Sequence, residues 1–137
     1  MKMDAAAFVA DQQLIEALRK YALPVVCEGD RVLFNQGDAP DCLYIVHNGE
    51  VVLTMQSAAG DVLMDMPANE GSLLGLPGLI GNVPYSLSAT AKGGAEVSFV
   101  GREDLNSLML TNPSVSVGIL RVLAAEVRTA RMALVES

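Results

Sequence analysis

The sequence predicts a mainly β fold with flanking helices, and three observations indicate it. Short runs rich in β-branched residues fill the middle of the chain, with turn signals between them. A stretch of helical periodicity precedes these runs, and a longer one follows them. The chain has 137 residues, 51% of them hydrophobic and 18% charged, which suits a globular domain with its own core. We therefore expect one domain over residues 1–137, built around a barrel or roll of strands.

The first predicted element is a helix over residues 5–22. Its apolar residues recur at helical spacing: Phe8, Leu14, Ile15, Leu18 and Tyr21. Pro24 ends the stretch, because proline disrupts the interior of a helix. The strand region is then expected over residues 25–100. Its predicted strands are RVLF, LYIV, EVVLTM, VLMDM and AEVSFV, and its turns are NQGD, HNGE, SAAGD, PANEG and KGGA.

Two helices are expected over residues 101–135. The run REDLNSLML after Gly101 predicts a short helix, whose acidic residues favour a helix start. Asn112 followed by Pro113 predicts the start of a second helix, since asparagine caps helices and proline suits the first turn. That helix is expected to continue to the end of the chain.

Charge and cysteine content exclude several classes of protein. A formal net charge of -7 opposes attraction to phosphate backbones, so we expect no direct nucleic-acid partner. Cys27 and Cys42 lack a C-x-x-C spacing, which favours buried thiols in a reducing compartment, although a redox pair stays open. No segment has the ~20 apolar residues that span a bilayer, so we expect a cytoplasmic protein without membrane contact.

The segment GDRVLFNQGDAPDCLYIVHNGEVVLT resembles the first half of the β-roll in cyclic-nucleotide-binding domains. This is the family of bacterial Crp/Fnr-type regulators and kinase A regulatory subunits. Gly29, Gly37 and Gly49 stand where its strands turn sharply. The resemblance covers nearly the whole chain. It implies a β-roll, that is, a double-stranded β-helix resembling a jelly roll, with an N-terminal helix and a long C-terminal helix.

The resemblance also implies a phosphate-binding cassette in GLPGLIGNVPYSLSATAK, residues 75–92. In the family, a glutamate after the first glycine accepts the ribose 2′-hydroxyl, and a later arginine neutralises the cyclic phosphate. Here Leu76 stands at the glutamate position and Tyr85 at the arginine position. The candidate ligand-binding residues from this alignment are Gly75, Leu76, Pro77, Gly78, Pro84, Tyr85, Ser86 and Ser88.

These two departures reduce the expected affinity for cyclic nucleotides. The missing arginine removes a charge-assisted bond worth roughly 1.5–3 kcal/mol, and unpaired ribose hydroxyls cost about 1–3 kcal/mol. Cyclic AMP and cyclic GMP should therefore bind weakly or not at all, and no cofactor is expected. A less polar metabolite is the open alternative, because it would suit Leu76, Pro77 and Tyr85.

The C-terminal helix carries two apolar stripes. One stripe is expected to pack on the domain itself: Val115, Ile119 and Val122. The other follows the a and d positions of a heptad: Leu120, Leu123, Val127, Ala130 and Leu134. Glu126 and Arg131 then occupy g and e positions suited to an interchain ion pair. We expect a parallel homodimer, which the resemblance also implies, while cover of the chain's own core stays the alternative.

The expected function is that of a non-enzymatic regulatory or sensor domain, which signals through a dimerising C-terminal helix. A cupin-type enzyme is disfavoured because His47 is the only histidine and a cupin metal site needs several. No catalytic residues and no metal site are predicted. A Crp/Fnr-type regulator would continue past Ser137 into a helix-turn-helix. The alternative is therefore an effector domain of a transcription regulator that binds a cyclic nucleotide or another metabolite.

Overall fold

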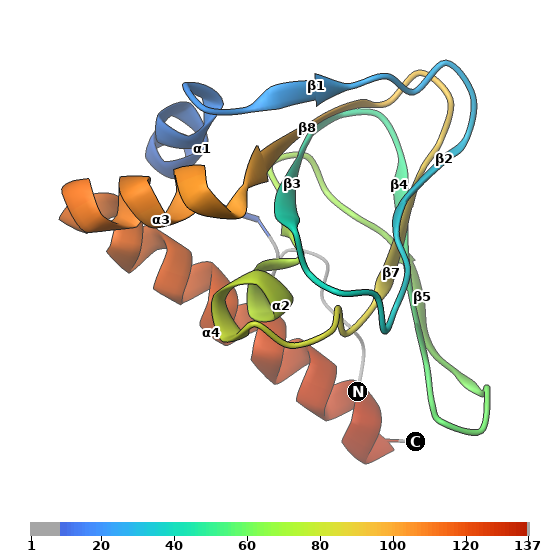
Figure 1. Ribbon diagram of the computed structural model, residues 1–137. Helices are drawn as coiled ribbons and strands as arrows, with labels where there is room; N and C mark the ends of the chain where they lie inside the picture. The colour runs from blue at the N-terminus through green and yellow to red at the C-terminus, as the bar shows by residue number, and fades with distance from the viewer. Residues whose placement is uncertain (1–8, 137) are drawn as a thin grey trace.

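The computed structural model describes residues 9–136, apart from the side chains of residues 126, 127 and 129–136 (Figure 1). Within this range two antiparallel four-stranded sheets face each other as a roll. Helices cover the outer face of the first sheet, whereas the second sheet lies on the opposite side of the roll (Figure 1). This arrangement is the predicted mainly β fold with flanking helices.

The order of the first sheet is β1 (Leu23–Val25), β8 (Glu96–Gly101), β3 (Cys42–Asn48), β6 (Leu73–Leu74). The order of the second sheet is β2 (Arg31–Phe34), β7 (Ser88–Ala91), β4 (Val51–Gln56), β5 (Val62–Pro67). All five predicted runs form strands, whereas the short strands β1, β6 and β7 were not predicted individually. Pro24 lies within β1, which tolerates it because β1 is an edge strand.

The N-terminal helix is shorter than the predicted range of 5–22, for α1 spans Gln12–Arg19. The side chain of Asp11 accepts a hydrogen bond from the amide of Leu14 at 2.8 Å and so caps the helix start. Val9 instead forms an isolated bridge with Ser72. The prediction was therefore wrong for residues 9–11 and 20–22, and Phe8 lies outside the described residues.

The two C-terminal helices begin where the sequence predicts. Helix α3 spans Arg102–Thr111, and helix α4 spans Pro113–Glu136. The Asn112 side chain accepts from the amide of Val115 at 3.4 Å, next to the proline of the first turn.

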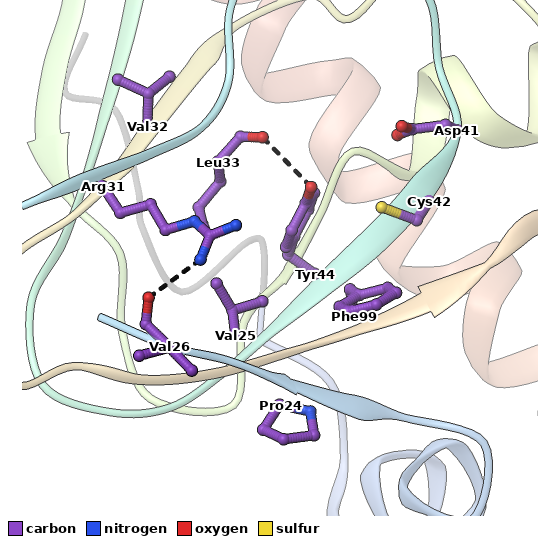
Figure 2. Close-up of a pocket in the computed structure, with 10 residues that line it drawn as sticks. All are labelled: Pro24, Val25, Val26, Arg31, Val32, Leu33, Asp41, Cys42, Tyr44 and Phe99. Atoms are coloured by element: carbon purple, nitrogen blue, oxygen red, sulfur yellow. Dashed lines mark hydrogen bonds between the residues drawn. The ribbon is translucent and has the colours of Figure 1, made fainter. Parts of the chain in front are cut away.

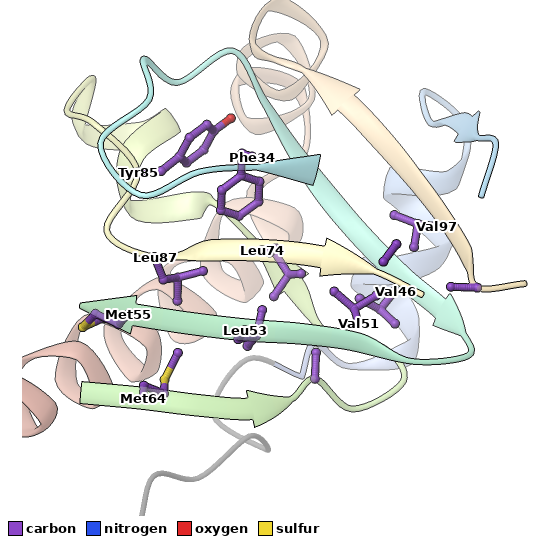
Figure 3. Packing of buried hydrophobic residues seen from close by; sticks show 14 of the residues in the cluster. Phe34, Val46, Val51, Leu53, Met55, Met64, Leu74, Tyr85, Leu87 and Val97 are labelled. Carbon is purple, nitrogen blue, oxygen red and sulfur yellow. The ribbon is translucent and has the colours of Figure 1, made fainter. Parts of the chain in front are cut away.

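Two apolar cores form on either side of the first sheet. The roll interior holds residues from both sheets, among them Phe34, Val46, Leu53, Met55, Met64, Leu74, Tyr85 and Leu87 (Figure 3). The second core, between the first sheet and the helices, includes Leu14, Leu18, Leu43, Ile45, Leu76, Leu105 and Ile119. Alternate residues of a strand point to opposite faces, so the first sheet contributes to both cores.

Candidate ligand-binding cassette

The cassette helix α2 spans Leu76–Gly81, at the predicted position. Gly75 precedes it with a φ of +92°, a backbone conformation that residues other than glycine rarely adopt. A Cβ atom at Gly75 would also lie 2.8 Å from Cε1 of Tyr85. The turn into the helix therefore requires glycine, both for its backbone angle and for the close approach of the tyrosine ring.

Tyr85, at the arginine position of the alignment, points into the roll interior and is only 3% exposed. Its ring stacks on Phe34 with the centroids 4.2 Å apart (Figure 3). Its hydroxyl donates to the carbonyl of Cys42 at 2.7 Å and accepts from the amides of Asp41 and Cys42 at 3.2 and 3.3 Å. An oxygen of the Asp41 carboxylate lies 3.1 Å from the same hydroxyl. The phenol group thus has its polar partners within the chain.

The Tyr85 ring also covers the first turn of α2. A Cβ atom at Gly78 would lie 3.2 Å from Cδ1 of Tyr85, so the ring runs across Gly75 and Gly78. Burial raises the pKa of Tyr85 to about 12, and the phenol therefore stays neutral at neutral pH. Lys92, the one basic residue of the 75–92 segment, pairs instead with Asp30 at 3.4 Å.

Leu76, at the glutamate position of the alignment, lies in a different core from Tyr85. Its side chain is fully buried in the helical core, next to the apolar residues of the first sheet. The structure therefore does not bring the two departures from the family pattern together in one pocket. A carboxylate at position 76 would enter an apolar environment with a large desolvation cost.

The other predicted cassette residues differ in exposure. Gly78 is buried beneath the tyrosine ring, Pro77 and Ser86 are half-buried, and Pro84 is exposed. The hydroxyl of Ser88, at the start of β7, accepts a hydrogen bond from the amide of Gln36 at 2.7 Å. Ser88 therefore joins β7 to the turn that follows β2.

Further hydrogen bonds join the cassette to the loop before β3. The amide of Tyr85 donates to Asp38 at 3.0 Å, and its carbonyl accepts from Gly37 at 2.9 Å. The Arg102 guanidinium donates to the Asn82 side chain at 2.9 Å and to the carbonyl of Pro40 at 2.7 Å. Sequence reasoning missed Arg102, because nothing near it in the sequence indicates that α3 begins beside the cassette.

The predicted dimer residues are only partly described. Leu120 is 55% exposed, and its neighbour Val117 is 49% exposed. Leu123 is half-buried against the helical core, together with the buried stripe Val115, Ile119 and Val122. The side chains of the remaining predicted positions lie outside the described residues: Glu126, Val127, Ala130, Arg131 and Leu134.

The remaining candidate side chains have structural partners. Cys27 and Cys42 are buried free thiols, and burial raises the pKa of Cys42 to about 11. His47 lies 2.6 Å from the hydroxyl of Ser98 and 3.2 Å from the guanidinium of Arg19. Among the described residues, no group of three or more histidine, cysteine or acidic side chains is placed to hold a metal ion.

A β-roll with a short cassette helix and flanking helices is the class of domain that this fold defines. The model of the cyclic nucleotide-binding domain family matches residues 24–112, and the chain belongs to this family. Among curated proteins, none matches the sequence significantly. Within the described residues, no helix combines the length and apolar character needed to cross a bilayer.

Solved structures show the same fold. The catabolite activator protein of Thermus thermophilus superposes with a TM-score of 0.75 at 24% identity, over 96% of this chain and 62% of that one. This chain thus spans less than two thirds of that protein. The N-terminal domain of a transcriptional regulator from Streptomyces coelicolor A3(2) superposes with a TM-score of 0.64 at 25% identity, over 91% of this chain and 89% of that one. A cyclic nucleotide-binding-like protein from Brucella abortus superposes with a TM-score of 0.57 at 26% identity, over 71% of this chain and 83% of that one.

Proposed function

We propose that this chain is a non-enzymatic regulatory domain whose cassette is held in place by its own Tyr85 and not by a cyclic nucleotide. In this proposal the domain works as a homodimer through α4. The observation that carries it is the position of Tyr85, whose ring covers Gly75 and Gly78 and whose hydroxyl bonds to Asp41 and Cys42.

A cyclic phosphate would need space at the start of α2, and the Tyr85 ring occupies that space beside Gly75 and Gly78. Moving the ring away would break its stacking on Phe34 and leave the amides of Asp41 and Cys42 without their acceptor. Each unsatisfied buried group costs roughly 1–3 kcal/mol. The ligand would gain no ion pair in return, since the neutral phenol supplies no cation for the phosphate.

The dimer is supported by apolar surface on α4 that its own domain leaves uncovered. Val117 and Leu120 are about half exposed, one turn apart on the same helix. In the heptad pattern, Leu120 begins the seam that continues through Leu123, Val127, Ala130 and Leu134. A second copy of α4 would cover this face across a two-fold axis, with Glu126 and Arg131 as the interchain pair.

Calorimetry with cyclic AMP and cyclic GMP tests the cassette. The wild type should show no binding heat at ligand concentrations up to about 1 mM, where only very weak complexes form. Tyr85→Arg removes the ring and supplies a cation, so it should bind measurably, whereas Tyr85→Phe keeps the ring and should not. Circular dichroism establishes that each variant is folded. A submicromolar wild-type affinity would overturn the proposal.

A second candidate function is the effector domain of a transcription regulator that responds to another small molecule. One observation favours it: a cavity of about 340 Å³ opens at the side of the roll, between β1 and β2. The Streptomyces protein with the same fold is itself the N-terminal domain of a transcriptional regulator. Detection of a small molecule bound in this cavity would favour the second candidate, the effector domain.

A further inference from the structure

The side cavity lies between the edge strands of the two sheets. Strands β1 and β2 each pair with a neighbour on one side only, and the cavity of about 340 Å³ lies between them. Its walls come from β1, β2, β3 and β8 (Figure 2). The lining residues with polar or aromatic side chains are Arg31, Asp41, Cys42, Tyr44 and Phe99. Its volume is in the lower part of the range of small-molecule pockets.

Aromatic rings form the apolar wall of the cavity. Tyr44 and Phe99 lie with their centroids 6.5 Å apart and their planes 48° from parallel, and both rings are half-buried. The Tyr44 hydroxyl donates to the carbonyl of Leu33 at 3.2 Å, which leaves the face of the ring as its contact surface (Figure 2). Val26 and Val32 at the rim are 63% and 53% exposed. A flat apolar group would cover surface that water now contacts.

Arg31 supplies a positive charge with unused donors. Its side chain extends between Leu33 and Val26, and one guanidinium nitrogen donates to the carbonyl of Val26 at 3.1 Å (Figure 2). Among the described residues, no carboxylate lies within ion-pair distance of this guanidinium. A guanidinium has five N–H donors in a fixed plane that matches a carboxylate.

Asp41 limits the charge that a ligand can carry. Its carboxylate also lines the cavity and contacts the Tyr85 hydroxyl at 3.1 Å. A second negative charge on the ligand would face this carboxylate and be repelled. The cavity therefore suits a single anionic group, placed toward Arg31.

We propose that this cavity binds a small molecule that has one carboxylate and a flat aromatic body. The carboxylate pairs with Arg31, and the aromatic body packs on Tyr44 and Phe99. The inference rests on the proposed function in one respect, since a cassette occupied by the chain's own Tyr85 requires any ligand to bind elsewhere.

The cavity also contacts the cassette through a row of rings. Tyr44 lies 5.5 Å from Phe34, and Phe34 stacks on Tyr85 at 4.2 Å, measured between centroids. A ligand that displaces Tyr44 would therefore move rings that end at Gly75, the first residue before α2. The three rings thus join the proposed site to the cassette by direct contacts within the chain.

A nuclear magnetic resonance titration with 2-naphthoate tests the proposal, with the uncharged 2-naphthamide as the matched ligand. Amide signals of Val25, Val32 and Tyr44 should shift, with a dissociation constant at or below about 1 mM. Naphthoate should bind about tenfold more tightly than naphthamide. Arg31→Gln should abolish this preference, whereas Arg121→Gln, on α4 outside the cavity, should retain it.

Each outcome separates the side cavity from the cassette. Equal affinity for the two naphthalene compounds, or the same loss of preference in Arg31→Gln and Arg121→Gln, would overturn the side-cavity site. If cyclic AMP shifts only the amide signals of residues 75–78, the proposed function is contradicted. The side-cavity site is then decided by the naphthoate titration alone. Tyr44→Phe keeps the ring and should retain naphthoate binding.

Discussion

The cassette and the C-terminal helix differ in how much of their apolar surface the domain covers. Leu76 and Tyr85 are buried in two separate cores, and the polar group of Tyr85 has partners within the chain. On α4, Val117 and Leu120 instead remain about half exposed. Side chains that are buried, such as Leu76 and Tyr85, offer no surface to a partner, whereas exposed apolar side chains on a long helix do. This difference is consistent with the two proposals, that Tyr85 holds the cassette in place and that α4 is the dimer surface.

The largest expected effect comes from removing the ring that covers the cassette. Tyr85→Ala should lower the free energy of unfolding by about 3–5 kcal/mol, because it leaves a cavity beside Phe34 and removes the acceptor of the buried Cys42 amide. Urea unfolding followed by circular dichroism measures it. Tyr21→Ala is the control, since Tyr21 is 42% exposed and its loss should cost only about 0.5 kcal/mol. Equal losses in the two variants would show that Tyr85 does not hold the cassette.

A smaller effect is expected at the exposed face of α4. Leu120→Glu should weaken dimerisation on the order of a hundredfold, because two carboxylates would meet in an apolar seam. The roll should stay folded, since the Leu120 side chain is 55% exposed within one chain. Leu123 is less suitable for this test because it packs on the helical core.

Sedimentation equilibrium at micromolar concentration measures this change. The control is Leu110→Glu, since Leu110 is 86% exposed but lies on α3, and this variant should dimerise like the wild type. A monomeric wild type, or a Leu120→Glu variant with unchanged assembly, would contradict the proposed dimer.

The smallest effect concerns His47, whose ring contacts Arg19 and so joins β3 of the first sheet to α1. Burial and the neighbouring Arg19 lower the pKa of His47 below its ordinary value, although Glu96 acts in the opposite direction. From about pH 6.5 down to the lowered pKa of the folded state, the unfolded chain binds more protons than the folded one, so the stability from His47 falls as the pH falls through this window. Above that range the contribution is constant.

Urea unfolding at about pH 7.5 and pH 5.5 measures the pH dependence of stability. The wild type should lose more stability between these values than His47→Gln, which cannot titrate there. The same loss in both proteins would assign the pH dependence to other groups. A difference in the opposite direction would mean that protonated His47 is stabilised in the folded chain.

Local patterns in the sequence were sufficient for much of the fold. The five predicted strands, the cassette helix and the start of α4 at Asn112 and Pro113 all depend on neighbouring residues, through alternation, turn signals and capping. The substitutions at Leu76 and Tyr85 were also visible in the alignment with the family pattern. Strands β1 and β6 were missed because two or three residues are too few to show a period, and β7 was missed because its four small residues, SATA, carry no strong apolar pattern.

The arrangement of the cassette depended on contacts between distant segments. Tyr85 meets Phe34, Asp41 and Cys42 because strand pairing brings the loop before β3 next to the loop after α2. The same packing directs Leu76 into the helical core and places Arg102 beside Asn82. A sequence reports which residues can form such contacts. Only the folded chain selects among them, because hydrogen bonds and close packing require defined distances between residues far apart in the sequence.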